Sequence, residues 1–292
     1  MDESAALELV ANIVGDAGDD AAVVDDLVLT TDMLHAATDF PEGTSRYTAG
    51  WRAVGASLSD VAAMGARARA AVAVYAAPNF DETELDAFLR GAIDVCEAVG
   101  ARYVGGDLDT HAELTIVSSV LGKTPDPVYR SGATPDEGVF VTGTLGRSAA
   151  AVAEFEAKNA DRGNELFQFL PRVDAGVHVA PIASAMTDSS DGLARSLHLI
   201  AAASGCGMSI QSDSLPIDEA VLEIGESVED YIEMGVYFGE DFELVFTADP
   251  SAVSEIRDAL DIQVTQIGVT TADDVQMDGE PLPDRGYGHG SS

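Results

Sequence analysis

The stretch Met186-Thr187-Asp188-Ser189-Ser190-Asp191-Gly192-Leu193 places two acids three residues apart, with two hydroxyl side chains between them and a glycine behind them. An apolar strand should stop here, and a helix over 193–203 should follow at once. A helix N-terminus favours anions through its free N–H groups and its dipole, so it suits a ligand phosphate, with cations shared by the two acids. The alternative is a capping box, in which Ser or Asp only binds orphan backbone amides. Because similar acid motifs recur along the chain, the ligand interpretation is favoured.

Charge is the most unusual property of this 292-residue chain, since 51 Asp and Glu against 15 Lys and Arg give a formal net charge of −36. There is no basic face to displace counterions, so nucleic acid is excluded as a partner. The acids are spread along the sequence, which is typical of a solvated surface in high salt, where screening weakens self-repulsion. The sequence therefore indicates a halophilic source, and any single acid is expected to serve surface solvation.

The hydrophobic content, the cysteines and the apolar runs limit the class of protein. Hydrophobic residues make up 46% of the chain, enough for a sizeable core. Cys96 and Cys206 are too few and too isolated for a disulfide framework or a zinc site. The sequence has neither a basic segment leading into an apolar run nor a stretch approaching ~18 uninterrupted apolar residues. We expect a cytoplasmic protein with no membrane partner.

Helices and strands are predicted to alternate in both halves, so the fold class is α/β (α+β). Three prolines mark 123–136 as a linker, which predicts two domains, 1–125 and 126–292. Helices are expected at 45–64, 82–99, 147–157, 173–185 and 250–260. Strands are expected at 21–25, 28–31, 70–76, 114–121, 138–142, 208–211, 242–248 and 264–269.

Several acids lie at predicted strand or helix ends beside glycine or hydroxyl residues. Asp60 is the exception, because it lies inside a helix among apolar neighbours, where an unpaired carboxylate is costly. Each acid alone could be a cap, a turn residue or a surface charge. Together they predict a site for several cations, since carboxylates and substrate phosphates are the ligands that Mg²⁺ prefers. The acids are Asp19, Asp20, Asp32, Asp60, Asp107, Asp188 and Asp191.

Other motifs carry weaker signals. Gly122-Lys123-Thr124 ends like a P-loop, but Val117 occupies the position of its first glycine, and the glycines near Gly143 lack the dinucleotide pattern. Arg130, in a Gly/Ser loop of a base-poor chain, is either a phosphate contact or a surface arginine. Glu240 or Asp241 could face a ligand ahead of a strand. Tyr287 either belongs to a frayed tail or stacks on a substrate ring.

In this order, the motifs resemble those of the thiamine-monophosphate kinase family, within the aminoimidazole-ribonucleotide-synthetase-like superfamily. The resemblance covers nearly the whole chain. The matching segments are GDDAAV (18–23), TTDML (30–34), LSDVAAMG (58–65), GGD (105–107), RSGA (130–133), VTG (141–143), DSSDGL (188–193) and GEDFEL (239–244).

The resemblance implies ATP-dependent phosphorylation of thiamine monophosphate to thiamine diphosphate, with several Mg²⁺ ions and K⁺ as a further candidate. It implies a two-domain fold in which N-terminal sheets of two copies join in a barrel, giving a homodimer with the ATP site near that interface. It also implies roles for single residues. The metal ligands would be Asp20, Thr30, Thr31, Asp32, Asp60, Asp107, Asp188 and Asp191; the ATP contacts Gly106, Asp107, Arg130 and Ser190; and the substrate contacts Asp39, Glu240 and Tyr287.

Three positions depart from the family pattern. Asp39 stands where the family has a substrate-contacting His, Ser57 stands where it has an Asn, and Phe238 stands for the first glycine of the Gly-Gly-Glu-Asp step. The ATP and metal half therefore matches better than the thiamine half.

The expected mechanism is direct in-line transfer without a protein base, because the substrate phosphate is already a nucleophile. No catalytic residue is therefore assigned. One alternative is a sister enzyme such as aminoimidazole ribonucleotide synthetase, and another is a non-catalytic nucleotide- or cation-binding homologue.

Overall fold

A computed structural model gives the fold, and it describes residues 6, 9–10, 13–14, 17–257 and 260–286. The first sheet has the strand order β1-β2-β5-β3-β4. Its strands are β1 (Ala22–Val24), β2 (Leu27–His35), β3 (Arg67–Ala77), β4 (Arg102–Thr110) and β5 (Thr115–Lys123). All neighbours are antiparallel except β3 and β4, which helix α3 (Glu82–Ala98) connects in parallel. One edge of this sheet ends at β4.

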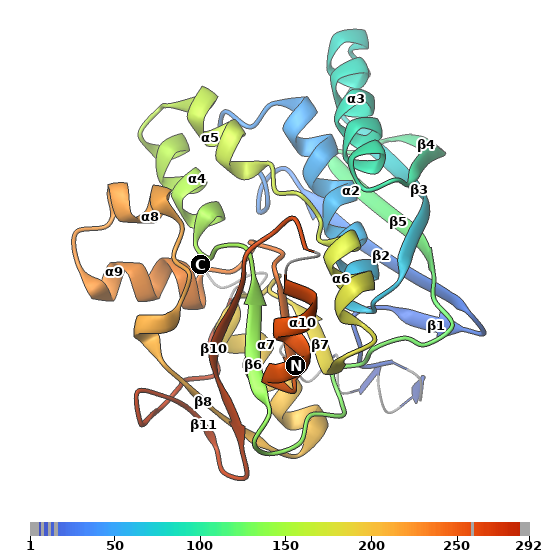
Figure 1. Ribbon diagram of the computed structural model, residues 1–292. Helices are drawn as coiled ribbons and strands as arrows, with labels where there is room; N and C mark the ends of the chain where they lie inside the picture. The colour runs from blue at the N-terminus through green and yellow to red at the C-terminus, as the bar shows by residue number, and fades with distance from the viewer. Residues whose placement is uncertain (1–5, 7–8, 11–12, 15–16, 258–259, 287–292) are drawn as a thin grey trace.

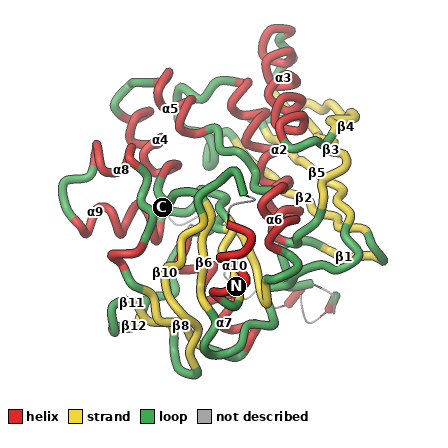
Figure 2. The backbone as a smooth tube through the Cα atoms, viewed as in Figure 1, coloured by secondary structure: helices red, strands yellow, loops and turns green. Residues whose placement is uncertain are grey.

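The second sheet is built from the later part of the chain, with the order β12-β11-β8-β10-β6-β9-β7. Its strands are β6 (Gly138–Thr142), β7 (Ala183–Asp188), β8 (Gly207–Ile210), β9 (Leu244–Ala248), β10 (Val264–Thr271), β11 (Val275–Met277) and β12 (Glu280–Pro281). Figure 2 shows the two sets of strands with helices around and between them. Sheets mixed with helices in both halves confirm the predicted α/β (α+β) class, whereas the boundary at 125/126 stays a prediction.

The remaining helices belong to the second half of the chain, apart from α2 (Arg46–Ala63), which lies between the two halves (Figure 1). They are α4 (Arg147–Glu156), α5 (Ala160–Phe167), α6 (Val173–Val179), α7 (Leu193–Ser204), α8 (Glu219–Ile224), α9 (Val228–Ile232) and α10 (Pro250–Ile256), with the short helices η1 (Ser212–Ser214) and η2 (Glu233–Tyr237). Within the described residues, none of these helices combines the length and apolar character needed to cross a bilayer.

Helix α2 organises the molecule. Ser45 caps its first turn by accepting a hydrogen bond from the backbone N–H of Thr48. It contacts β2, β3 and β5 on one side and α6 and β7 on the other, and 14 of its 18 residues are buried. Leu58 belongs to the same apolar cluster as Met186 and Phe246 of the second sheet. The side chains of Ser57 and Ser59 on this helix are therefore held inside the protein.

Two expected elements differ in the structure. The helix expected over 173–185 ends at Val179, and β7 begins at Ala183. The reason is Pro181, which cannot continue a helix, so that the chain is extended after it. The strand expected from 242 begins at Leu244, because Phe242 has a left-handed backbone with φ +54°. The predicted hairpin over 21–31 and the helices near 45–64 and 82–99 are confirmed.

Candidate functional site

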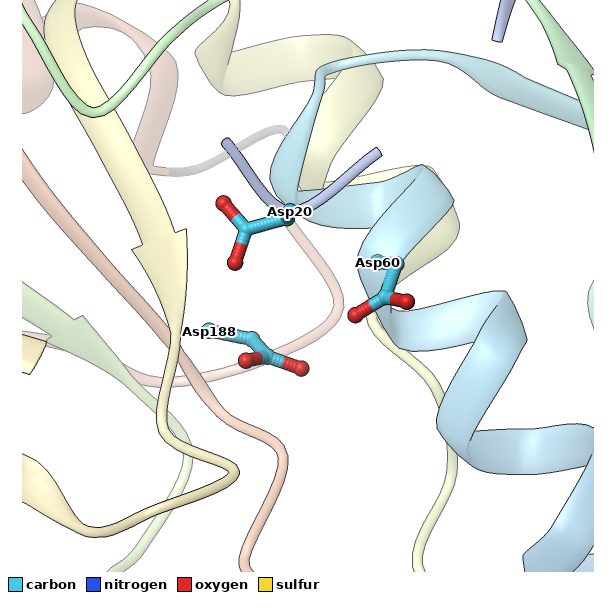
Figure 3. Close-up of side chains that lie close together, drawn as sticks. All are labelled: Asp20, Asp60 and Asp188. Carbon is cyan, nitrogen blue, oxygen red and sulfur yellow. The ribbon is translucent and has the colours of Figure 1, made fainter. Parts of the chain in front are cut away.

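Three carboxylates from distant parts of the sequence meet in one place. Asp20 precedes β1, Asp60 lies on α2, and Asp188 ends β7, and one oxygen of each lies within 4.8 Å of the others. Figure 3 shows their side chains facing a common space. The Asp20 side chain is 1% exposed and Asp188 is 2% exposed. These acids are therefore distinct from the solvated surface acids that the composition predicts.

Two serines on α2 fix acids from both sheets. Residues 57 and 59 lie about 200° apart around a helix, so their side chains leave opposite sides. Ser57 donates to Asp32 Oδ2 of β2 at 2.5 Å, whereas Ser59 donates to Asp188 Oδ2 of β7 at 2.6 Å. Because α2 lies between the sheets, one helix orients a carboxylate from each half.

Strand β2 supplies a second pair of polar groups to the same region. Thr30 and Asp32 share the face of β2 that packs on α2, since side chains two apart in a strand point the same way. Thr30 donates to Asp60 Oδ2 at 2.5 Å. Ser118 of β5 lies 2.6 Å from the Ser57 hydroxyl and supports it. Asp32 therefore lies beside the cluster of three acids, and a hydroxyl network holds it there.

The electrostatics of the site reflect burial of like charges. The pKa of Asp188 is raised to about 7, mainly by burial and also by the charge of Asp20, while hydrogen bonds from Ser59 and Ser190 oppose the shift. Burial also raises the pKa of Asp60 well above its usual value, assisted by the charges of Asp32, Asp188 and Asp20. Without a counter-cation, this cluster therefore favours bound protons near neutral pH.

One cation of the chain already reaches the cluster. Arg130 donates from Nη2 to Asp20 Oδ1 at 2.8 Å and from Nε to the Thr187 hydroxyl at 3.2 Å. The other oxygen of Asp20, Oδ2, is buried and accepts no hydrogen bond from any described residue. A buried carboxylate oxygen without a partner, in a group of three acids, fits a hard divalent cation such as Mg²⁺.

The loop after β7 does not act as a helix cap. Gly192 occupies the N-cap position of α7 and has no side chain to cap it. Ser189 instead accepts a hydrogen bond from the backbone N–H of Glu243, and Ser190 O accepts one from Glu240 N–H at 2.6 Å. Asp191 is half-buried in the same loop. The capping interpretation of this motif is therefore wrong, and the loop instead joins the acid cluster to residues 240–243.

Three predicted site residues lie away from the cluster in this chain. Thr31 points to the other face of β2, where it donates to Ser118 O. Gly106 and Asp107 lie exposed on β4, three strands from β2, which at ~4.8 Å per strand is about 14 Å. A Cβ on Gly106 would lie 1.7 Å from Ala73 O, so the glycine is also required for β4 to pair with β3.

Two of the residues predicted to contact substrate line one cavity. Asp39 and Glu240 both border a cavity of about 440 Å³, together with Phe40, Phe167 and Phe238. Asp39 Oδ2 accepts hydrogen bonds from the His35 N–H at 2.6 Å and the Thr38 hydroxyl at 2.9 Å. Tyr287 lies outside the described residues.

Sequence reasoning left several positioning groups without a role, namely Ser57, Ser59, Ser118 and Thr187. A signal for Ser57 and Ser59 was present, because two hydroxyls flank Leu58 in an otherwise apolar helix. Their hydrogen-bond partners could not be predicted from the sequence, since Asp32 is 25 residues from Ser57 and Asp188 is 129 residues from Ser59 in the chain.

Two family models match separate parts of the chain. The family model of the AIR synthase related protein N-terminal domain matches residues 18–124, and that of the C-terminal domain matches residues 134–278. The thiamine-monophosphate kinase of Halobacterium salinarum is 57% identical over 291 residues, covering 99% of this chain and 100% of that protein. That of Methanospirillum hungatei is 39% identical over 302 residues, covering 99% of each.

Among solved structures, AaThiL complexed with AMPPCP and TMP superposes with a TM-score of 0.89 at 27% sequence identity. The match covers 99% of this chain and 97% of that one. The similarity therefore extends over both sheets and over the helix between them.

Proposed function

The chain belongs to the AIR synthase related family, and from that premise we propose that it is a kinase that transfers a phosphoryl group from ATP to thiamine monophosphate. The products are ADP and thiamine diphosphate. The observation that carries this function is full-length similarity to thiamine-monophosphate kinases, joined to a buried acid cluster at the junction of the two sheets. The AMPPCP and TMP bound to the structural relative are an ATP analogue and the phosphate acceptor of this reaction.

Asp20, Asp60 and Asp188 would hold Mg²⁺, with Asp32 and Asp191 beside them. Mg²⁺ held there would neutralise charge on the transferring phosphoryl group. Ser57, Ser59 and Thr30 orient the carboxylates through the hydrogen bonds described above. K⁺ as a further bound ion remains a proposal from the resemblance.

The residues of this chain position the reactants and do not activate the nucleophile. An oxygen of thiamine monophosphate already carries negative charge, so no side chain has to remove a proton. Arg130 lies at the cluster with its guanidinium on Asp20, where it can also meet a nucleotide phosphate. Ser190 and the backbone of its loop face the same region. Direct in-line transfer is the mechanism that this arrangement supports.

The cavity beside Asp39 and Glu240 is our proposed thiamine site. Four acids and no base border it, and three phenylalanines complete its wall. An aromatic, positively charged thiazolium suits acidic and aromatic walls. Asp39 replaces the family His there, so its carboxylate provides charge where the family provides an imidazole. Tyr287 is retained as a proposed contact.

A homodimer is proposed through the exposed face of the first sheet. Apolar side chains of neighbouring strands lie on this face, each between 40% and 55% exposed: Leu29, Met33, Val72, Val104 and Leu108. An apolar sheet face of this kind with an open edge at β4 is expected to be covered by another protein surface. A second copy is the occupant we propose. It would also explain Gly106 and Asp107, which lie too far from the cluster of their own chain.

Halophilic adaptation and a cytoplasmic location are also proposals. The net charge of −36 and the similarity to a Halobacterium protein support the first. Use of ATP as the phosphoryl donor supports the second.

The function is tested by incubating the purified protein with ATP, Mg²⁺ and thiamine monophosphate in molar KCl. We expect thiamine diphosphate and ADP in equal amounts, separated by chromatography. ADP or ATP binding without product would favour the non-catalytic homologue. Turnover only with another phosphate acceptor or with a ribonucleotide would favour a sister enzyme.

A further inference from the structure

Helix α2 carries one arginine that the mechanism above does not use. Arg52 is 1% exposed, the largest fully buried side chain among the described residues. Its guanidinium lies 3.6 Å from the ring centroid of Phe167, and the rings of Phe169 and Phe242 are within 5.5 Å. A fully buried cation is costly unless its donors are satisfied, so its partners should matter.

The hydrogen-bond partners of Arg52 among the described residues all belong to the second half of the chain. Nη1 donates to Phe167 O at 2.8 Å and to the Ser148 hydroxyl at 3.3 Å. Nη2 donates to the backbone oxygen of Glu240 at 3.2 Å and to its carboxylate Oε2 at 2.5 Å. Arg52 therefore connects the helix that carries Asp60 to the loop that carries Glu240, across the junction of the two halves.

The backbone of that loop has a conformation that needs support from surrounding residues. Gly239, Glu240 and Phe242 have φ values of +85°, +64° and +54°. Left-handed conformations are unfavourable for residues with a Cβ and persist only where the surrounding structure imposes them. The imposing contacts are the two bonds from Arg52, the bond from Glu240 N–H to Ser190 O, and two backbone N–H bonds to Asp241 from Gly146 and Ser148.

Glu240 contacts both Arg52 and the cavity proposed for thiamine. Its carboxylate binds Arg52 on the inner side, and the residue borders the cavity proposed for thiamine on the other. Arg52 itself does not border that cavity and cannot touch a ligand there. It can act on substrate only through Glu240.

We propose that Arg52 is a positioning residue that fixes the Glu240 carboxylate at the wall of the thiamine cavity and keeps this wall in register with the acid cluster on α2. The proposal rests on the proposed function, because it names Glu240 as the wall that the thiamine ring meets. A guanidinium is suited to this positioning role, since its planar group donates hydrogen bonds to several oxygens at fixed angles while its face packs on phenylalanine rings. A lysine ammonium could bind Glu240 but not all four acceptors together.

The test compares Arg52→Met, Arg52→Lys, Glu240→Gln and the double variant Arg52→Met with Glu240→Gln. Because Glu240 contributes to substrate binding, Arg52→Met should raise KM for thiamine monophosphate about tenfold or more, a change of about 1.4 kcal/mol, and leave KM for ATP within twofold. Arg52→Lys should restore part of the loss. The double variant should be no worse than the poorer single variant, since both act through one carboxylate.

Trp51→Phe is the matched control. Trp51 is the neighbouring residue on α2 and donates from Nε1 to Phe169 O, so it crosses the same junction without touching Glu240. Trp51→Phe should leave KM for thiamine monophosphate within twofold of the wild type. An equal rise in this control, equal rises in both KM values, or additive effects in the double variant would each overturn the proposal.

A second readout does not depend on turnover. Amide hydrogen exchange over residues 238–244 should be faster in the Arg52 variants than in the wild type, and unchanged in Trp51→Phe. If Arg52→Met does not fold, Arg52→Lys with Glu240→Gln provides the same comparison. Unchanged exchange in a folded Arg52 variant overturns the positioning role, whereas absence of thiamine diphosphate with the wild type overturns only the proposed function.

Discussion

Lowering the pH from 8 to 6 should weaken Mg²⁺ binding and, at the same time, stabilise the metal-free protein. The reason is Asp188, whose pKa rises from 3.8 to about 7 because the carboxyl is buried beside Asp20. A folded-state pKa above the unfolded value means that the folded protein holds the proton more tightly. The stabilisation of the folded protein by this proton is fully present below pH 3.8 and is lost as the pH rises through about 7.

The magnitude follows from the shift. A rise of about 3 pKa units at 1.36 kcal/mol per unit means that the ionised carboxylate opposes folding by about 4 kcal/mol above pH 8 in the absence of metal. The Mg²⁺ that we propose for this site would bind the ionised carboxylate, so below pH 7 it would have to displace this proton. The apparent dissociation constant for Mg²⁺ should therefore rise about tenfold per pH unit below 7 and flatten above it.

Isothermal titration of Mg²⁺ into the protein in molar KCl, in two buffers of different ionisation enthalpy, measures both the affinity and the protons released. We expect proton release at pH 6 and little at pH 8, and a gain in Tm from Mg²⁺ that grows with pH. Asp188→Asn should reduce the pH slope, and what remains should come from the proton on Asp60, whose pKa is also raised. Asp86→Asn, an exposed acid on α3 paired with Arg90, should leave it unchanged. Equal Mg²⁺ affinity at pH 6 and pH 8 in the wild type would refute the reasoning.

Three further predictions follow from the geometry. Ser59→Ala removes the hydrogen bond that orients Asp188, so the Mg²⁺ dissociation constant should rise about 10–100-fold in the same titration, without loss of the folded state. Met33→Glu introduces charge on the exposed sheet face and should give monomers by light scattering, whereas Val269→Glu, at a similarly exposed position on β10, should not. Leu197→Ala, fully buried on α7, should lower the free energy of unfolding in urea by about 2–5 kcal/mol, against less than about 0.5 kcal/mol for the half-exposed Leu222→Ala.

Features that depend on local chemistry could be predicted from the sequence. The apolar spacing of 45–64 predicts α2, because a helix with small and apolar residues on most of its faces must be buried. The position of Asp188 at a strand end was also readable, since an apolar run stops there. By contrast, the helix expected over 173–185 was wrong, because helical spacing outweighed the break that Pro181 introduces.

The site could be predicted only as a set of acids. Three of them, Asp20, Asp60 and Asp188, meet in the structure, while Asp107 lies at the far edge of the sheet. Nothing local distinguishes these cases, because each is an acid beside glycine, hydroxyl or apolar residues. The distinction comes from strand order and from the placement of α2 between two sheets, which are properties of the whole fold.

The same physics separates the two populations of acids in this chain. Exposed acids such as Asp26, whose side chain is 46% accessible, interact through solvent, and molar salt reduces the screening distance to about 3 Å. Asp20, Asp60 and Asp188 are shielded from that solvent, so their mutual repulsion at separations within 4.8 Å persists in any salt. Arg130 offsets part of it, and protons or a divalent cation must offset the rest. High salt therefore leaves this repulsion in place, and we propose that Mg²⁺ offsets it and so links the charge of the cluster to the binding of two phosphate chains.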